Sequence, residues 1–248
     1  VKIHRPTLLC LSVRKMRDSR VRNFMWSLGF SGCFAISSEG QSGGLALFWK
    51  DSVTVSPKAC NSRCIDVHVS SDMAPIWRAT FDYGEPRRED RVHFWSLIRR
   101  LKTMWNGSWI ICGDFNEVLS QDEHIGPRDR SEQQIAAFRE CLRDCELRDL
   151  GFSGPKFTWC NRQDPNSLVK VRLDRAVVNS AFTYCFDGCY VEFISCDAMF
   201  HRISCDNSLG HIMFANPLDL SYAMNETSRM SYLQSHCSDY AYAIKINL

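Results

Sequence analysis

The stretch Trp109-Ile110-Ile111-Cys112-Gly113-Asp114-Phe115-Asn116-Glu117 is the most informative part of the chain. Its run of apolar residues is typical of a strand that is buried on both faces. Such a strand would bring the side chains of Asp114 and Asn116 to one edge of a sheet. There a carboxylate can orient and deprotonate a water molecule, and an amide can stabilise charge on phosphoryl oxygens. The alternative is that both side chains only close a turn, as Asp and Asn commonly do.

Short runs with strand character surround this stretch. On its N-terminal side we predict strands at Cys33–Ile36, Gly44–Trp49, Val53–Pro57, Cys64–Val69 and Ile76–Phe81. On its C-terminal side we predict strands at Lys156–Cys160, Val169–Val177, Val191–Ser195 and Leu209–Phe214. Gly44–Trp49 is apolar throughout, which predicts an interior strand covered on both faces.

Apolar residues recur at helical spacing in three further segments. These are Asp18–Leu28, the segment between Pro86 and Asn106, and the residues that follow the capping-box pattern Ser131-Glu132-Gln133-Gln134. Strands and helices without a repeat or a linker predict a single layered α/β domain over residues 1–217. Residues 218–248 are rich in Ser, Tyr and Asn and are predicted to lie outside its core.

Composition restricts the class of protein. Of the 248 residues, 45% are hydrophobic and 23% charged, as in a globular protein. No segment approaches the roughly 18 uninterrupted apolar residues that a membrane span needs. The N-terminus, Val1–Pro6, has neither an initiator Met nor the layout of a signal peptide, so we expect a fragment of a longer reading frame.

The sequence contains 13 cysteines, an odd number that argues against a fully paired secreted framework. None of them has the spacing of a zinc knuckle, and most lie in apolar runs, where a free cysteine acts as a small hydrophobic residue. We therefore expect a reduced, intracellular compartment.

Net charge is only +2, which provides no global field for a polyanionic partner. Basic residues are nevertheless clustered, for example at Arg87-Arg88-Arg91 and at Arg172 and Arg175. These clusters are consistent with phosphate contacts or, equally, with solvated protein surface.

The order of motifs along the chain carries a resemblance. Tyr83-Gly84-Glu85-Pro86 precedes the central stretch, and it is followed by Gly154-Pro155-Lys156-Phe157-Thr158-Trp159, by Arg172-Leu173-Asp174-Arg175-Ala176 and by Ser204-Cys205-Asp206-Asn207-Ser208. Over about residues 2–216 this series resembles the exonuclease–endonuclease–phosphatase family. The residues of these motifs are similar to those of endonuclease domains of plant LINE-type (non-LTR) retrotransposons, which are relatives of DNase I.

The resemblance implies a fold and a function. The fold would be a DNase I-like, two-layered β-sandwich flanked by helices, with the first strand missing because it lies before Val1. The activity would be hydrolysis of DNA phosphodiester bonds with Mg²⁺ or Mn²⁺. The intact element would add a reverse-transcriptase domain and act in the nucleus. We expect Phe157 and Trp159 to support the sheet rather than to stack on bases.

The resemblance also implies roles for individual residues. Asp114 would orient the attacking water, and Asn116 would bind the scissile phosphate. Tyr83 would contact that phosphate or the leaving group. Asp174 would support the histidine of a closing Ser-Asp-His motif.

The closing motif would provide the remaining contacts. Asp206 is the aspartate of that motif, counted here among the catalytic residues and as the one metal ligand. Arg175 and Asn207 would contact substrate phosphates.

Two positions depart from the family pattern. Val13 stands where the family has the glutamate that binds the metal, and an alkyl group cannot ligate a hard cation. Asn207 stands in place of the catalytic histidine and cannot carry a proton near neutral pH. We therefore expect an endonuclease domain with impaired or lost activity. The alternatives are a non-catalytic nucleic-acid-binding remnant and a phosphatase acting on a small phosphoester or an inositol lipid.

Overall fold

The computed structural model describes residues 6–12, 18–36, 44–72, 74–161, 163–164, 167–193, 200–204 and 211–215. Val13, Asp206 and Asn207 lie outside these ranges, as do residues 218–248. What the sequence predicts for them therefore stays a prediction.

Two six-stranded sheets form the body of the protein. The first has the order β13-β14-β15-β1-β3-β2, with β1 parallel to β15 and the other described pairs antiparallel. Its strands are β1 (Leu8–Ser12), β2 (Gly32–Ile36), β3 (Leu45–Trp49), β13 (Tyr190–Phe193), β14 (Phe200–Ser204) and β15 (His211–Ala215).

The second sheet has the order β4-β5-β6-β7-β12-β9. Only β6 and β7 run parallel in it. Its strands are β4 (Thr54–Asn61), β5 (Cys64–Ser71), β6 (Ala74–Tyr83), β7 (Trp109–Asp114), β9 (Arg148–Asp149) and β12 (Asp174–Val178).

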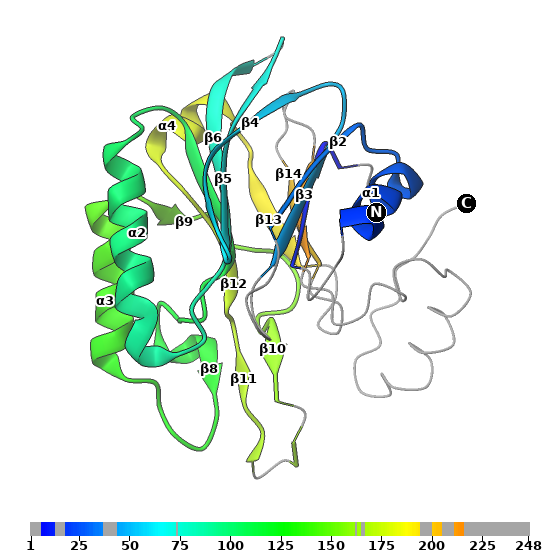
Figure 1. Cartoon of the computed structure of the whole chain (residues 1–248). Helices are drawn as coiled ribbons and strands as arrows, with labels where there is room; N and C mark the ends of the chain where they lie inside the picture. Colours follow the sequence, from blue (N-terminus) through cyan, green and yellow to red (C-terminus); the bar gives the residue numbers. More distant parts are fainter. Residues whose placement is uncertain are drawn as a thin grey trace.

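A small three-stranded sheet, with the order β10-β11-β8, extends from one end of the body (Figure 1). Its strands are β8 (His124–Ile125), β10 (Trp159–Cys160) and β11 (Lys170–Val171). The helices are α1 (Asp18–Leu28), α2 (Arg91–Thr103), α3 (Glu132–Asp144) and α4 (Ser180–Cys185), with short 3-10 turns η1 (Arg88–Asp90) and η2 (Gln121–Glu123).

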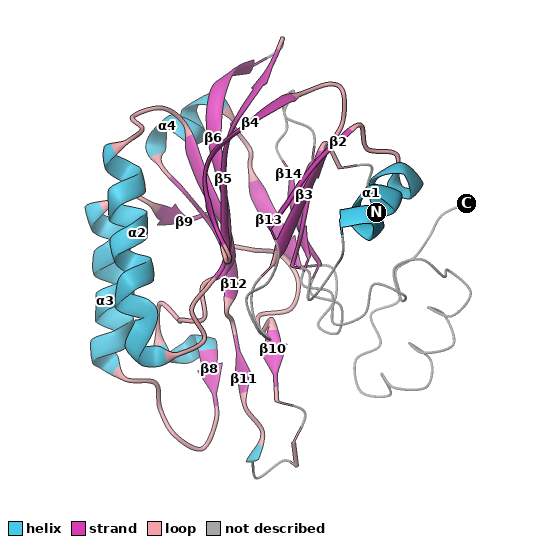
Figure 2. Cartoon of the chain, viewed as in Figure 1, coloured by secondary structure: helices cyan, strands magenta, loops and turns pink. Residues whose placement is uncertain are grey.

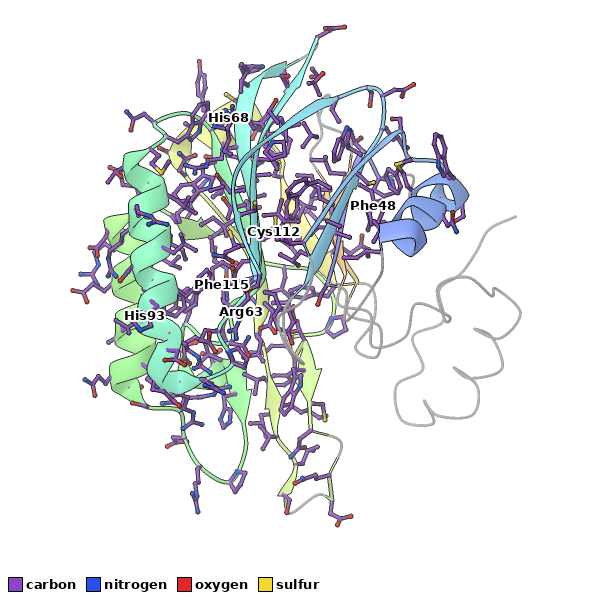
Figure 3. All side chains as sticks on the ribbon, viewed as in Figure 1. Phe48, Arg63, His68, His93, Cys112 and Phe115 are labelled. Carbon is purple, nitrogen blue, oxygen red and sulfur yellow. The ribbon has the colours of Figure 1, made fainter. Side chains whose placement is uncertain are left out.

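Four clusters of buried side chains hold the described elements together, and the smallest contains Val118, Ile135, Val171 and Leu173. The largest contains Leu8 and Leu47 of the first sheet together with Val67 and Phe81 of the second. A second cluster packs α2 and α3 against the outer face of the second sheet. A third packs α1 against the first sheet, where Phe48 lies (Figure 3). Helices α1, α2 and α3 therefore cover the outer faces of the two sheets (Figure 2), whereas Phe182 of α4 belongs to the cluster that the sheets share.

The mixed α/β fold expected from the sequence is confirmed. The apolar run Gly44–Trp49 contains β3, which lies between β1 and β2 and contributes to buried clusters on both faces. Alternating residues of a strand point to opposite faces, so a run that is apolar on both faces needs a partner layer on each side. No helix in the described part of the chain is long and apolar enough to cross a membrane.

Two details differ from expectation. The predicted strand Val169–Val177 is divided into β11 and β12, because the chain leaves the small sheet and enters the large one at Arg172 and Leu173. Trp159 does not pack into the core, since it is 40% exposed on the small sheet, whereas Thr158 beside it is buried. Two-residue strands that extend from the body offer little surface to cover a tryptophan.

The described cysteines do not form a zinc site or a disulfide framework. Nine of them are free thiols, and Cys189 is disulfide-bonded. Burial raises the pKa of the Cys10, Cys64 and Cys112 thiols, which keeps them protonated as hydrophobic core residues.

Candidate active site

Three of the residues singled out by the sequence meet at one edge of the second sheet. Tyr83 is the last residue of β6, and Asp114 is the last residue of β7. These strands are parallel, and Tyr83 is paired with Asp114. Asp174 begins the antiparallel strand β12 and is paired with Asp114 from the other side. Positions 83, 114 and 174 therefore form one row across three neighbouring strands.

The turn after β7 fixes Asn116 beside this row. The carboxylate Oδ1 of Asp114 accepts a hydrogen bond from the backbone N–H of Asn116 at 2.9 Å. Asn116 has φ 55°, a left-handed conformation that Asn adopts more readily than most residues. Its side-chain Nδ2 donates to the carbonyl of Gly84 at 3.2 Å. The Asx turn that was the structural alternative is thus present, and it holds the acid and the amide side by side.

Gly84 permits this close approach. Its N–H donates to the carbonyl of Asp114 at 2.7 Å. A Cβ at position 84 would lie 2.2 Å from that same carbonyl oxygen, a distance that no side chain tolerates. Only glycine therefore fits at this position of the Tyr83-Gly84-Glu85-Pro86 motif, because any side chain would collide with the backbone of the site.

We call Asp114 and Asp174 the acidic pair. Both are buried, with 8% and 1% of their surface exposed. Burial, together with the nearby Asp174 carboxyl, raises the pKa of Asp114 to about 8, against hydrogen bonds from Asn116 and the charge of Arg91. Burial and Asp114 also raise the pKa of the neighbouring Asp82 carboxyl. Burial and a neighbouring carboxyl therefore oppose the ionisation of both Asp114 and Asp82.

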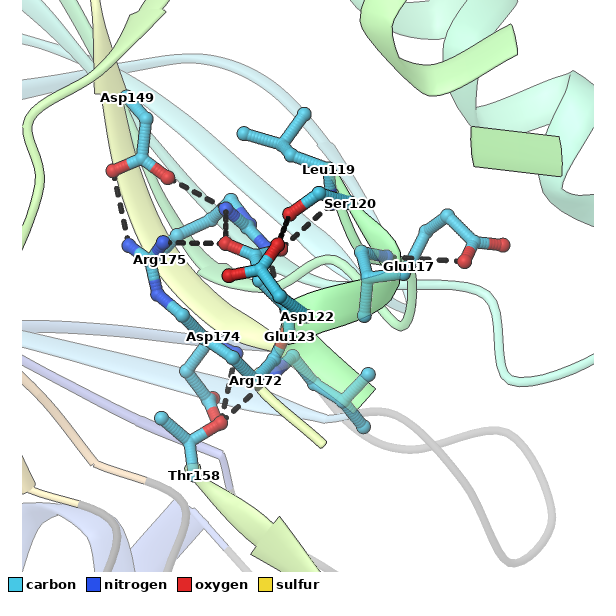
Figure 4. Close-up of polar contacts among 12 residues, drawn as sticks. Glu117, Leu119, Ser120, Asp122, Glu123, Asp149, Thr158, Arg172, Asp174 and Arg175 are labelled. Carbon is cyan, nitrogen blue, oxygen red and sulfur yellow. Dashed lines mark hydrogen bonds and ion pairs between the residues drawn. The ribbon is translucent and has the colours of Figure 1, made fainter. Parts of the chain in front are cut away.

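Thr158 holds the start of β12. Its hydroxyl oxygen accepts hydrogen bonds from the backbone N–H groups of Leu173 and Asp174, at 2.9 and 3.1 Å (Figure 4). The sequence motif around Trp159 therefore contributes to the site through its buried threonine and not through its aromatic residues.

Arg175 lies on the opposite face of β12 from the acidic pair, and its environment does not suit the predicted substrate contact. Its side chain is 0% exposed and binds Glu123 and Asp149. Arg172 binds the same two carboxylates (Figure 4). We call these four residues the paired cluster. Substrate phosphate could reach Arg175 only if this cluster opened, so the structure gives Arg175 an internal role.

Glu117, which ends the central motif, is also internal. It is 0% exposed, and its Oε2 accepts a hydrogen bond from Nη1 of Arg91. Arg91 also donates to the carbonyls of Glu85 and Pro86, at 3.1 and 3.3 Å. This ion pair connects the loop after Tyr83 to the loop after Asp114. Sequence reasoning placed Arg91 in a basic cluster and missed its pairing, since no local pattern joins positions 91 and 117.

A divalent cation would find suitable donor types here, because carboxylate oxygens are ligands that hard cations such as Mg²⁺ prefer. Within the described ranges, however, no group of three or more His, Cys, Asp or Glu side chains is arranged to hold a metal ion. The acidic pair would supply two carboxylates and needs further ligands from elsewhere. Asp206, the predicted ligand, is not among the described residues.

The fold and the row of polar groups at a sheet edge define a mixed α/β protein with a hydrolase-like site. Residues 14–195, more than half of the chain, match the model of the endonuclease/exonuclease/phosphatase family. The chain belongs to this family. The family that the sequence motifs indicated is thus confirmed.

Two solved structures agree in fold. The endonuclease domain of TRAS1, a telomere-specific non-LTR retrotransposon, is similar with a TM-score of 0.54 and 14% identity, over 76% of this chain and 92% of that chain. An AP endonuclease from Archaeoglobus fulgidus is similar with a TM-score of 0.53 and 14% identity, over 78% of this chain and 84% of that chain. A comparison with curated protein sequences finds no match.

Proposed function

We propose that this chain is a DNA endonuclease domain of the non-LTR retrotransposon type, built as a DNase I-like two-layered sandwich. Its hydrolytic rate would be several orders of magnitude below that of an intact site. The observation that carries the proposal is the row formed by Tyr83, Asp114 and Asp174, with Asn116 held beside it. The buried cluster shared by the two sheets supports the sandwich layering.

Each group in the row suits one part of phosphodiester hydrolysis. A carboxyl whose pKa lies near neutrality, as that of Asp114 does, can accept the proton of an attacking water. The second N–H of the Asn116 amide can donate to a phosphoryl oxygen, and the phenol of Tyr83 can contact the phosphate or the leaving group. Mg²⁺, bound through carboxylates, would neutralise charge on the phosphate.

The reduced rate follows from two side chains. Val13 supplies no metal ligand, and Asn207 cannot carry the charge or the proton of an imidazole. Loss of one positioned electrostatic group costs about 10²–10³ in rate, and loss of an acid–base group about 10²–10⁴. Because such groups act as a unit, the losses do not simply add.

A plasmid-nicking assay tests the function by repair. In Mg²⁺ we expect the natural chain to nick supercoiled DNA no faster than its Asp114→Ala variant. The double variant Val13→Glu with Asn207→His should gain Mg²⁺-dependent nicking, and adding Asp114→Ala should abolish it. Asp144→Asn, an exposed change on α3, is the matched control. Nicking by the natural chain that disappears in Asp114→Ala would refute the impairment.

Failure of the repaired variant to nick DNA, while it cleaves a small phosphoester, would instead favour the phosphatase alternative. Binding of DNA without any repairable cleavage would favour the non-catalytic remnant. DNA as partner, a following reverse-transcriptase domain and nuclear localisation belong to this proposal, and none of them is tested by the fold.

A further inference from the structure

Arg130 lies beside the candidate site, and the hydrogen-bond donors of its guanidinium lack acceptors among the described residues. Its side chain is only 11% exposed, and its Nη1 is 3.7 Å from Oε1 of Glu117, the residue that follows Asn116. That distance is too long for a hydrogen bond. Among the described residues, none accepts a hydrogen bond from this guanidinium, which carries five N–H donors.

Glu117 is already neutralised by another arginine. Arg91 donates to its Oε2 and is nearly buried as well, with 7% of the side chain exposed. Two guanidiniums therefore share the carboxylate of Glu117. Burial lowers the pKa of Arg130, and the nearby charges of Arg91 and Arg88 lower it further, against Glu117 and Asp114. The folded protein thus holds a cation in an unfavourable place.

The backbone of Arg130 is held in place by the side chain of Gln121. The carboxamide of Gln121 donates to the carbonyl of Arg130 at 2.6 Å and accepts from its N–H at 3.1 Å. This two-point contact fixes the end of the loop between β8 and α3. A fixed backbone carrying a guanidinium with unused donors is preorganised for an external anion, because little entropy is lost when the anion binds.

We propose that Arg130 binds a phosphate of the nucleic-acid backbone next to the acidic pair, the role that the sequence assigned to Arg175. This inference rests on the proposed function, because that function identifies the ligand as DNA. The planar guanidinium matches phosphate oxygens with two parallel hydrogen bonds. A phosphate at this position would accept hydrogen bonds from the unused donors of Arg130 and present the adjoining ester to Asp114 and Asn116.

The test is binding of a short DNA duplex in EDTA, measured by fluorescence anisotropy at several salt concentrations. Arg130→Met should weaken binding about tenfold, and the slope of log affinity against log salt should fall by about 0.9, as for one lost phosphate contact. Arg143→Met, which removes an exposed charge from the last turn of α3, should change the affinity less than about twofold.

Folding measurements separate this role from a structural one. Arg130→Met should keep its thermal midpoint within about 3 °C of the natural chain, because Arg91 still neutralises Glu117. Arg91→Met should lower the midpoint by about 8 °C or more, because it leaves a buried carboxylate without its main partner. A comparable drop in Arg130→Met would assign Arg130 to the core and overturn the proposal.

The binding outcomes are equally distinct. If the natural chain binds the duplex and Arg130→Met has the same affinity and salt slope, the role of Arg130 is refuted while the proposed function stands. If the natural chain does not bind the duplex at all, the proposed function itself is refuted.

Discussion

Asp174 and Arg175 are neighbours in β12, yet they belong to two groups of buried charges that differ in composition. In the paired cluster, each of two carboxylates contacts two guanidiniums. Burial opposes the ionisation of Glu123 and Asp149, but Arg175 and Arg172 outweigh it and lower the pKa of both. In the acidic pair, Asp114 and Asp174 are paired on neighbouring strands, and burial and Asp174 raise the pKa of Asp114.

The difference separates carboxylates whose ionisation arginines favour from a carboxyl, that of Asp114, whose ionisation burial and Asp174 oppose. The network of the paired cluster connects η2, β9 and β12 and can form without any partner molecule. A buried carboxyl with a raised pKa, such as Asp114, costs stability when it ionises. Under the two proposals above, a substrate phosphate would pair with Arg130, and its cation would pair with the carboxylate of Asp114.

The largest effect is expected when the paired cluster is broken. Arg175→Met should lower the free energy of unfolding by about 3–5 kcal/mol, because it leaves two buried carboxylates with one arginine. The measurement is the urea midpoint at constant m-value. Arg99→Met, which breaks the exposed pair with Asp144, should cost less than about 1 kcal/mol. Equal losses would mean that the cluster is no more important than a surface pair.

Removing charge from the acidic pair should have a smaller effect of the opposite sign. The folded pKa of Asp114 is above its unfolded value, so the natural chain loses stability as pH rises from about 4 to about 8. Asp114→Asn does not titrate and should be more stable at pH 9, by on the order of 2 kcal/mol, with no gain near pH 4. Urea unfolding at both pH values measures this, and a variant that is less stable at pH 9 would contradict it.

The opposite pH dependence is expected of the paired cluster. The folded pKa values of Glu123 and Asp149 are below their unfolded values, so their contribution is present above about pH 4–5 and is lost as pH falls through the folded values. In Arg175→Met that acid-dependent contribution should be smaller than in the natural chain.

The smallest effect concerns the strand start that positions Asp174. Thr158→Val should cost about 1–2 kcal/mol, because two buried backbone N–H groups lose their acceptor. Thr158→Ser keeps the hydroxyl and should cost less than about 1 kcal/mol. Thermal unfolding of the two variants gives the comparison. A serine variant as unstable as the valine variant would assign the effect to the lost methyl group.

The sequence by itself determined the local features of this protein. The apolar run before Asp114 predicted an interior strand that brings Asp114 and Asn116 to one edge of a sheet, with an Asx turn as the alternative reading of the two side chains. The order of motifs around Tyr83 and Asp174 indicated the family, which the match over residues 14–195 confirms. These features depend on neighbours within a few residues or on motif order, and both can be read from one chain.

Only the tertiary structure decided which charges are paired. Arg175 and Glu123 are 52 positions apart, and the closed network between them turns a predicted phosphate ligand into an internal residue. Trp159 is likewise exposed because a small sheet extends from the body, a feature that strand propensity does not contain. The position of Arg130 within a few ångströms of Glu117 also depends on the tertiary structure, because the loop before α3 brings the two residues together. Coulomb interactions depend on distance in space, which no periodicity in the sequence encodes.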